Sequence, residues 1–437
     1  MYLVAQTKYL DATCARWNME FAADMELLGQ NAKKAARLIA SASPSAKNMA
    51  LNRLAELLIS RQSAVLAANQ KDIEAARAAG LDAPRLDRLM LTPDLLGGMA
   101  ATCRHVANLP DPVGAVESQW QRPNGLLVGR MRIPLGVVAI IYESRPNVTI
   151  DAAVLCLKAG NAVVLRGGSE AVHSNTALAG LLHEALNIAG LPADAAQILP
   201  TADRAAVGLL CKMDQYIDVL IPRGGEKLIR AVTEQATMPV LKHYVGVCHA
   251  FIDAGADLEQ ALNIVYNGKV QRPGVCNALE CLLVHKEVAA DFLPQVAEKL
   301  GRAGVEFRAC PRSLLLLGAN ARPQSPEDLG QEFLALILAV CVADSLDAAL
   351  DHIARYGSQH TEVICTNNHA HAMRFLREAD ASMVGVNAST RFNDGGELGL
   401  GAEIGISTSK LHAYGPMGVQ ELTTTKFVVF GQGQVRG

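Results

Sequence analysis

Val163-Val-Leu-Arg-Gly-Gly-Ser-Glu170 is a continuous apolar segment that runs directly into an Arg-Gly-Gly turn and the start of a helix. The same plan returns in Val219-Leu-Ile-Pro-Arg-Gly-Gly-Glu226. Glycine lets a backbone approach a ligand closely, and the N-terminus of a helix offers unpaired N–H groups to an anion. The two turns predict a phosphate-bearing ligand at the carboxyl ends of parallel strands, with two ordinary strand-to-helix turns as the alternative.

Regular alternation of strands and helices surrounds these turns. We expect strands over 137–142, 162–165 and 217–221, with helices over 148–158 and about 170–189 between them. After residue 245 the alternation begins again, with strands near 250–253, 279–285, 337–342, 362–366 and 383–387 and a last strand over 423–430. Continuous apolar strands separated by helices predict parallel α/β sheets covered on both faces.

The chain of 437 residues is too long for one hydrophobic core. We expect a disordered lead-in over 1–24, a Rossmann-like cofactor-binding domain over 25–245, a catalytic domain over 246–395, and a return segment with the last strand over 396–437. Asn124-Gly125 is a strong hairpin signal and predicts a polar hairpin over 117–133. This hairpin is either an arm that reaches another subunit or a plain surface hairpin.

Composition excludes several classes of function. The net charge is −3 and the basic residues are spread along the chain, so neither a nucleic-acid patch nor a polybasic membrane anchor is expected. No run approaches 18 apolar residues, and the first residues lack the apolar core of a signal peptide. Ten scattered cysteines without a Cys-x-x-Cys pair indicate reduced thiols in the cytoplasm.

Cys276 follows a stretch, from Asn267 onward, whose glycines, proline, amides and cations predict a shaped loop before an apolar strand. The cations Lys269 and Arg272 would favour the thiolate, which is the nucleophilic form. A buried structural cysteine is the alternative. Cys276, Cys281 and His285 are too few for a zinc centre, so we expect no metal site.

A set of longer segments carries a family resemblance. They are 133–137 (Ile-Pro-Leu-Gly-Val), 141–147 (Ile-Tyr-Glu-Ser-Arg-Pro-Asn), 165–170, 243–249 (His-Tyr-Val-Gly-Val-Cys-His), 271–277 (Gln-Arg-Pro-Gly-Val-Cys-Asn), 356–362, 387–392 and 399–407. Their order resembles the aldehyde dehydrogenase superfamily, and within it the family that reduces L-glutamyl 5-phosphate in proline biosynthesis. The resemblance covers about residue 25 to the C-terminus and implies a cofactor domain and a domain with a cysteine nucleophile.

The resemblance assigns roles to individual positions. It makes Cys276 the nucleophile that forms a thioester, and the oxyanion hole rests on its backbone N–H with Asn147 or Asn277, because Ser144 stands where the superfamily has its usual asparagine. Arg166 stands where relatives use lysine to hold the adenosine ribose, and its fork suits a 2′-phosphate. The expected cofactor-binding set is Arg166, Gly167, Gly168, Ser169, Glu170, Arg223, Gly224, Gly225 and Glu332.

The implied reaction is NADPH-dependent reduction of L-glutamyl 5-phosphate to L-glutamate 5-semialdehyde and phosphate. Ser144, Arg145 and Arg391 are the expected substrate-binding residues, and Arg223 is a further candidate to hold the phosphate or the α-carboxylate. The usual deacylating glutamate aligns near His243, which has no carboxylate. A water-using aldehyde oxidoreductase and a non-enzymatic scaffold are the rival interpretations. A homo-oligomer is expected, and a contact with glutamate 5-kinase is left open.

Overall fold

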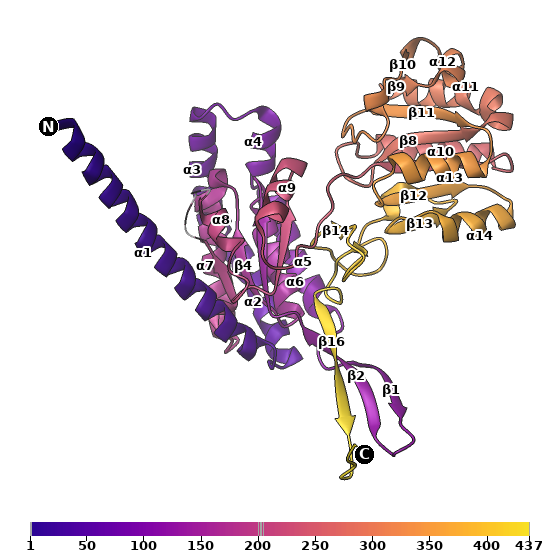
Figure 1. Cartoon of the computed structure of the whole chain (residues 1–437). Coiled ribbons are helices and arrows are strands. Elements are labelled where there is room, and N and C mark those ends of the chain that lie inside the picture. The colour runs from indigo at the N-terminus through magenta and orange to yellow at the C-terminus, as the bar shows by residue number, and fades with distance from the viewer. Residues whose placement is uncertain (1, 200, 202, 204, 437) are drawn as a thin grey trace. The chain divides into compact units, whose positions relative to one another are not determined.

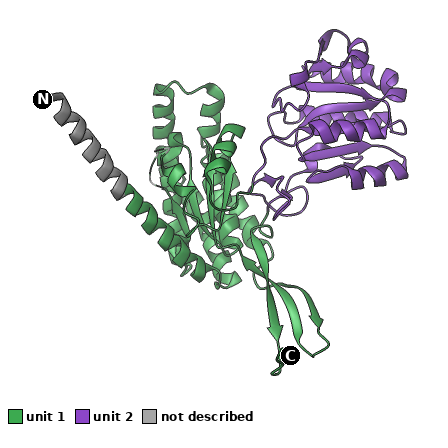
Figure 2. Cartoon of the chain, in the orientation of Figure 1, with its two compact units in different colours: residues 1–241, 418–437 green, residues 242–417 purple. Residues whose placement is uncertain are grey.

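A computed structural model describes the backbone of residues 2–199, 201, 203 and 205–436, and side chains from Phe21 onward within these ranges. The chain forms two compact units, drawn in green and purple in Figure 2. Unit 1 comprises 1–241 and 418–437, and unit 2 comprises 242–417. Most of the lead-in predicted over 1–24 lies outside the residues whose side chains are described, so it stays a prediction.

Unit 1 begins with five helices (Figure 1), namely α1 (Tyr2–Ile39), α2 (Pro44–Ser60), α3 (Gln62–Ala78), α4 (Ala83–Leu89) and α5 (Pro93–Asn108). Three of them start with the same local chemistry. Ser43, Asp82 and Thr92 each accept a hydrogen bond from the backbone N–H three residues later, and a proline follows in the first turn. These caps satisfy N–H groups that a helix cannot pair internally.

A parallel sheet of order β5-β4-β3-β6 follows. Its elements are β3 (Val137–Tyr142), α6 (Asn147–Lys158), β4 (Ala162–Arg166), η1 (Ser169–Ala171), α7 (Val172–Ile188), η2 (Ala193–Ala195), β5 (Ala196–Ile198), α8 (Ala205–Leu210), β6 (Val219–Arg223) and α9 (Glu226–Gln235). All residues of β3 and β4 are buried, as continuous apolar strands require. The chain builds β3, β4 and β5 in one direction and then places β6 on the other side of β3. The strand order therefore reverses between β3 and β6.

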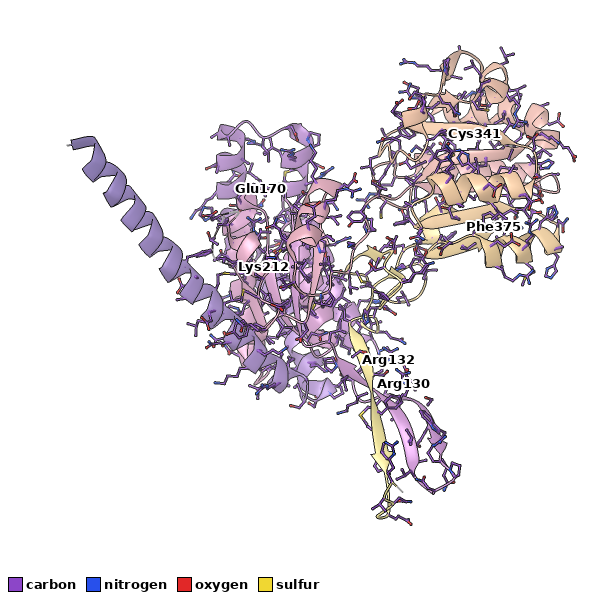
Figure 3. All side chains as sticks on the ribbon, viewed as in Figure 1. Arg130, Arg132, Glu170, Lys212, Cys341 and Phe375 are labelled. Carbon is purple, nitrogen blue, oxygen red and sulfur yellow. The ribbon has the colours of Figure 1, made fainter. Side chains whose placement is uncertain are left out.

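The predicted hairpin is present as β1 (Val116–Gln121) and β2 (Leu127–Pro134), and β16 (Thr423–Phe430) pairs with β2 as a third antiparallel strand. Side chains of β2 reach across to β16, as seen around Arg130 and Arg132 in Figure 3. Arg130 donates to Thr425 Oγ1 from Nε (3.1 Å), and Arg132 donates to Thr423 Oγ1 at 2.7 Å. The segment predicted over 396–437 is thus divided, because its last strand belongs to unit 1.

Unit 2 is built on a parallel sheet of order β10-β9-β11-β8-β7-β12-β13. Its first elements are β7 (Cys248–Ile252), α10 (Leu258–Val270), β8 (Leu279–His285), α11 (Lys286–Arg302), β9 (Glu306–Ala309), α12 (Pro311–Leu317), η3 (Gly318–Asn320), β10 (Ala321–Pro323) and η4 (Pro326–Asp328). They are followed by β11 (Ile337–Ala343), α13 (Leu346–Tyr356), β12 (Thr361–Cys365), α14 (His369–Glu378), β13 (Met383–Val386), η5 (Thr390–Phe392), β14 (Ile406–Ser407) and β15 (Gly415–Pro416). The central strand β8 is buried along its whole length.

The observed boundaries correct the expected ones at two places near the predicted sites. Helix α10 continues to Val270, so the loop before Cys276 is shorter than the stretch from Asn267 suggested. Strand β6 covers Val219–Arg223 and carries its arginine, where the apolar pattern had placed the strand at 217–221. Among the described residues, none of the helices combines the length and apolar character needed to cross a membrane.

Candidate active site

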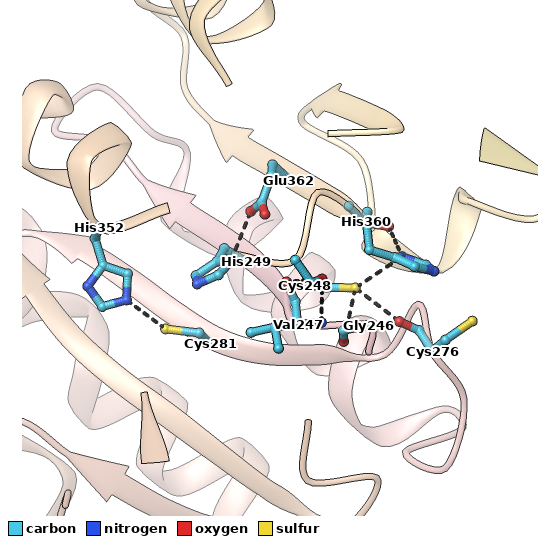
Figure 4. A network of polar contacts seen from close by, with 11 residues as sticks. Gly246, Val247, Cys248, His249, Cys276, Cys281, His352, His360 and Glu362 are labelled. Carbon is cyan, nitrogen blue, oxygen red and sulfur yellow. Dashed lines mark hydrogen bonds and ion pairs between the residues drawn. The ribbon is translucent and has the colours of Figure 1, made fainter. Parts of the chain in front are cut away.

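Cys276 lies in the loop between α10 and β8, directly before the N-terminal end of the central strand of unit 2. Its side chain is partly exposed, whereas the eight other described cysteines are buried. Figure 4 shows the Cys276 sulfur pointing away from Cys248, while its carbonyl oxygen faces that residue. The loop therefore presents this thiol where a reactant can reach it, as a nucleophile requires.

The segment that leads into β7, from Gly246 to Cys248, packs against the backbone of Cys276. A Cβ atom on Gly246 would lie 2.0 Å from the Cys276 carbonyl oxygen, so only glycine allows this close approach. Cys248 Sγ donates to the same oxygen at 3.2 Å, and burial, followed by the charge of Glu362, raises the pKa of this thiol. Glu332 accepts a hydrogen bond from the Gly246 N–H at 3.0 Å. These contacts fix the position of the nucleophile's backbone.

Two imidazoles lie beside the thiol. Cys276 Sγ and one ring nitrogen each of His243 and His360 all lie within 4.8 Å of one another. Burial, followed by the charge of His243, lowers the pKa of His360 to about 3, so this ring is neutral at pH 7. His243 Nδ1 lies 2.8 Å from the Ile406 carbonyl oxygen, which can only accept. Nδ1 therefore carries the proton, and Nε2 keeps a lone pair.

The surroundings of Cys276 correct two expectations from sequence. Lys269 is fully buried and its Nζ lies 2.7 Å from Glu280 Oε2, so its charge is matched by that carboxylate. Asn277 is buried, and its Nδ2 donates to the carbonyl oxygens of Arg391 (3.3 Å) and Asn393 (3.0 Å). Its amide donors thus hold the loop in place. Arg391 also belongs to this loop region, because its Nε donates to Gln271 Oε1 at 2.9 Å.

The predicted cofactor residues of unit 1 gather at the carboxyl ends of β4, β3 and β6. In the sheet register Arg166 lies beside Ile141, and Arg223 lies beside Tyr142. Both arginines thus flank β3, and Arg223 lies at the point where the strand order reverses. That point is where open α/β sheets bind their ligands. Arg166 is only 8% exposed and its Nη2 lies 3.5 Å from the Asp203 carbonyl oxygen.

The Arg-Gly-Gly turns differ from the expected anion cradles, because carboxylates lie against both. A Cβ on Gly168 would meet the Glu170 carboxylate at 2.4 Å, and one on Gly224 would meet Glu143 at 2.7 Å. The Gly225 N–H, at the start of α9, donates to Glu143 Oε2 at 3.3 Å. The carboxylates occupy space next to Gly168 and Gly224, and the positive groups at this edge are the arginines.

Ser144, Arg145 and Asn147 lie between β3 and the start of α6. The Ser144 hydroxyl donates to Glu170, so two residues of the predicted set are in contact, and Glu170 also accepts from Ser169 at 3.3 Å. Asn147 Nδ2 donates to Asp151 Oδ2 at 2.9 Å, and burial raises the pKa of Asp151 to about 6. Asn147 belongs to unit 1 and Cys276 to unit 2.

Sequence reasoning missed three residues that surround Cys276. Gly246, Cys248 and His360 were given no role, although all three lie in segments that carried the family resemblance. Their contacts join positions far apart in the chain, so no local spacing marks them. The one available signal was the single glycine, Gly246, directly before a buried strand, because glycine marks positions where backbones approach closely.

Comparison with known proteins agrees with this fold. The model of the aldehyde dehydrogenase family matches residues 7–308, so the chain belongs to that family and has its α/β fold, as predicted. The chain is 72% identical over 419 residues to the gamma-glutamyl phosphate reductase of Desulfovibrio desulfuricans, covering 95% of this chain and 99% of the relative. It is 69% identical to that of Nitratidesulfovibrio vulgaris Hildenborough, covering 96% and 100%.

A solved structure supports the same family membership. The gamma-glutamyl phosphate reductase of Thermotoga maritima superposes with a TM-score of 0.92 at 43% identity, covering 94% of this chain and 99% of that one. Within the aldehyde dehydrogenases the chain thus belongs to the gamma-glutamyl phosphate reductases, which are oxidoreductases. The rival interpretation as a non-enzymatic scaffold is therefore wrong.

Proposed function

We propose that this enzyme reduces L-glutamyl 5-phosphate to L-glutamate 5-semialdehyde and phosphate through a thioester on Cys276, as the second step of proline biosynthesis from glutamate. The observation that carries the proposal is the half-exposed Cys276 thiol, whose backbone is fixed by Gly246 and Cys248. A nucleophile held in one place turns a bimolecular attack into an effectively unimolecular step.

His243 is our candidate for activating the thiol. Its Nδ1–H is committed to the Ile406 carbonyl, which leaves Nε2 to accept the proton of Cys276. His360 is buried and neutral beside it, so it supplies no positive charge to the thiolate, and activation falls to His243. General-base assistance by a positioned histidine contributes about 10²–10⁴-fold.

The residues of unit 1 fit a nicotinamide cofactor, which the family uses. The fit rests on Arg166 and Arg223 at the edge where the strand order reverses, and on open space at Gly225, where an added Cβ would meet nothing within 4 Å. Arg166 would hold a 2′-phosphate, which favours NADPH over NADH. Glu332, next to Gly246, would accept from the nicotinamide ribose. The bound cofactor supplies the hydride.

Cys276 performs the covalent steps. The thiolate attacks the carbonyl carbon of the acyl phosphate, a C–S bond forms, and the C–O bond to the phosphate breaks. The backbone N–H of Cys276 stabilises the oxyanion, and Asn277 keeps that N–H in place through its bonds to Arg391 and Asn393. After reduction of the thioester, the hemithioacetal collapses, the C–S bond breaks, and the thiolate is regenerated with release of the semialdehyde.

The fate of the thioester distinguishes this function from a water-using aldehyde dehydrogenase. No carboxylate is present in Lys242-His-Tyr-Val-Gly246, where water-using relatives align their base. In the reverse direction, oxidation of the semialdehyde with NADP, we expect inorganic phosphate to be the acyl acceptor. The oxidation therefore requires added phosphate, and arsenate replaces it.

A steady-state assay with and without phosphate tests this proposal. Rapid phosphate-free turnover that yields free glutamate would assign His243 to water activation and the enzyme to the water-using class. A His243→Ala variant serves as the matched measurement, because it removes the proposed base and leaves His360, which contacts Cys248, in place. We expect it to slow thioester formation, which a pre-steady-state record of NADPH formation from the semialdehyde and NADP resolves.

The three-stranded sheet of β1, β2 and β16 is our candidate for self-association. Its apolar side chains Trp120, Phe427, Val429 and Phe430 are exposed, and Trp120 packs edge-on against Phe427 at 6.4 Å. Exposed apolar clusters on a sheet are typical of protein interfaces. We expect a homo-oligomer whose mass, measured by light scattering, falls to that of the single chain in Phe427→Asp and Phe430→Asp. A monomeric parent protein would contradict this.

The cytoplasm is the location that we propose, because all nine described cysteines are free.

A further inference from the structure

A second group of histidine and cysteine side chains, of the types that bind metal ions, lies in unit 2, separate from Cys276. His249, Cys281 and His352 each offer one ligand atom, and these atoms all lie within 4.8 Å of one another. The group involves none of the residues proposed for the reduction. Figure 4 shows it on the opposite side of Cys248 from the Cys276 sulfur.

The sheet brings these residues together by register. Glu362 on β12 pairs with His249 on β7, and His249 pairs with Cys281 on β8, so three polar residues form a row across adjacent buried strands. His352 reaches the row from α13, and its ring lies edge-on to His249 with 5.5 Å between centroids. Four polar or ionisable groups thus share one place in a core of aliphatic side chains.

His249 is buried with one ring nitrogen unpaired. It is 0% exposed, and its Nε2 has no hydrogen-bond partner among the residues that the structure describes. Its Nδ1 lies 3.0 Å from Glu362 Oε2 and is paired with that carboxylate, whose Oε1 lacks a hydrogen-bond partner among the same residues. Buried polar groups without partners are costly and rare in native proteins. A bound cation would satisfy both residues.

The distance between Cys281 Sγ and His352 Nε2 is compatible with a zinc ion bound to both atoms. A tetrahedral zinc ion with bonds of about 2.0–2.1 Å to nitrogen and 2.3 Å to sulfur sets the two ligand atoms about 3.6 Å apart. Cys281 Sγ and His352 Nε2 are 3.6 Å apart. Imidazole and thiolate ligands favour zinc over magnesium or calcium, which prefer oxygen.

The carboxylate beside His249 suits the same ligands. Glu362 lies at Nδ1 of His249 and leaves Nε2 to face the ion, which is the usual arrangement of a carboxylate that orients a metal-bound histidine. His352 is only partly buried and gives the site a path to solvent.

We propose that His249, Cys281 and His352 form a zinc site in unit 2, with Glu362 orienting His249 and water in the fourth position. Binding converts the Cys281 thiol to a thiolate and releases one proton for each ion bound. The bound ion joins β7, β8 and α13 and thereby stabilises the strands whose ends carry Cys248 and Cys276.

The site is tested by zinc binding to the full-length chain in a Cys276→Ala background, which removes the other group of His243, Cys276 and His360. Metal is first removed from the protein with a chelator. The protein is then titrated with Zn²⁺, and the bound zinc is measured by inductively coupled plasma mass spectrometry. We expect one ion per chain, no binding of Mg²⁺, and release of one proton per ion. Adding Glu362→Gln should weaken zinc binding by about 10- to 100-fold.

Two ligand variants and one matched control complete the test. His352→Gln changes a partly exposed helix residue, so the variant should fold. We expect His352→Gln and Cys281→Ser each to abolish zinc binding. Cys365→Ser replaces another buried thiol of unit 2 outside the group and should still bind one ion. With Co²⁺ in place of Zn²⁺, the thiolate-to-metal charge-transfer absorption should be lost in Cys281→Ser and kept in Cys365→Ser. Absence of zinc in the Cys276→Ala protein, or binding that survives loss of Cys281 and His352, would overturn the proposal.

Discussion

Replacing Gly246 by alanine tests whether the position of the Cys276 backbone controls the rate. The added Cβ would lie 2.0 Å from the Cys276 carbonyl oxygen and 2.8 Å from its carbonyl carbon, whereas real Cβ atoms keep about 3.0 Å or more. Both contacts are to backbone, so no side-chain rotation can relieve them. The two segments must separate by about 1 Å, a displacement that at a reacting centre lowers rates on the order of 100-fold.

The expected loss in kcat/KM corresponds to about 2.7 kcal/mol of transition-state stabilisation. We also expect about 1–3 kcal/mol of lost stability from overpacking, measured by urea unfolding. The activity assay is phosphate-dependent oxidation of the semialdehyde with NADP, well below the melting temperature of the variant.

Gly255→Ala is the control for this experiment. Gly255 follows β7 in the same unit, but its added Cβ would meet nothing closer than 3.9 Å. We expect its kcat/KM to stay within about twofold of the parent, as for a substitution without a clash. If Gly246→Ala also stays within about threefold of the parent while folded, the close approach to Cys276 is not what positions the nucleophile.

Further outcomes follow from other contacts. Arg166→Ala should lower the preference for NADP over NAD by about 10- to 100-fold, and equal use of both cofactors by the parent would contradict the assignment. Asn277→Ala removes the bonds to Arg391 and Asn393 and should lower the unfolding free energy by about 1–3 kcal/mol; an unchanged urea midpoint would show that those bonds add nothing. Burial raises the pKa of Glu280 from 4.5 to about 7, so the folded state keeps its proton to higher pH than the unfolded state. Stability should therefore fall between pH 4.5 and 7 by about 3 kcal/mol at most, and Glu280→Gln should remove that part of the slope; parallel profiles for both proteins would refute this.

Much of the fold could be predicted because its strands are continuous apolar runs between helices. The strands Val137–Tyr142 and Leu279–His285 begin and end where the apolar pattern does. Helix α10 runs past Tyr266 because its polar and glycine residues, which resemble a loop in sequence, still complete its last turn. Local composition therefore misplaced the boundary next to the nucleophile.

The candidate site could be predicted only in part, because its chemistry depends on pairings between distant positions. Cys276 was found from its loop and the family resemblance. The pairing of Lys269 with Glu280 and the close approach of Gly246 to Cys276 depend on the packing of the strands. A cation near a thiol in sequence can be bound to a carboxylate in space, which no spacing rule reveals.

The most direct test of the central claim is to identify the covalent intermediate. The enzyme is mixed with the semialdehyde and NADP in the absence of phosphate, quenched in acid, and analysed by intact mass and peptide mass spectrometry. We predict one glutamyl group per chain on the peptide that contains Cys276, removed when phosphate is added before the quench and absent in Cys276→Ser. A glutamyl group on another cysteine, or turnover without any labelled thiol, would contradict the account.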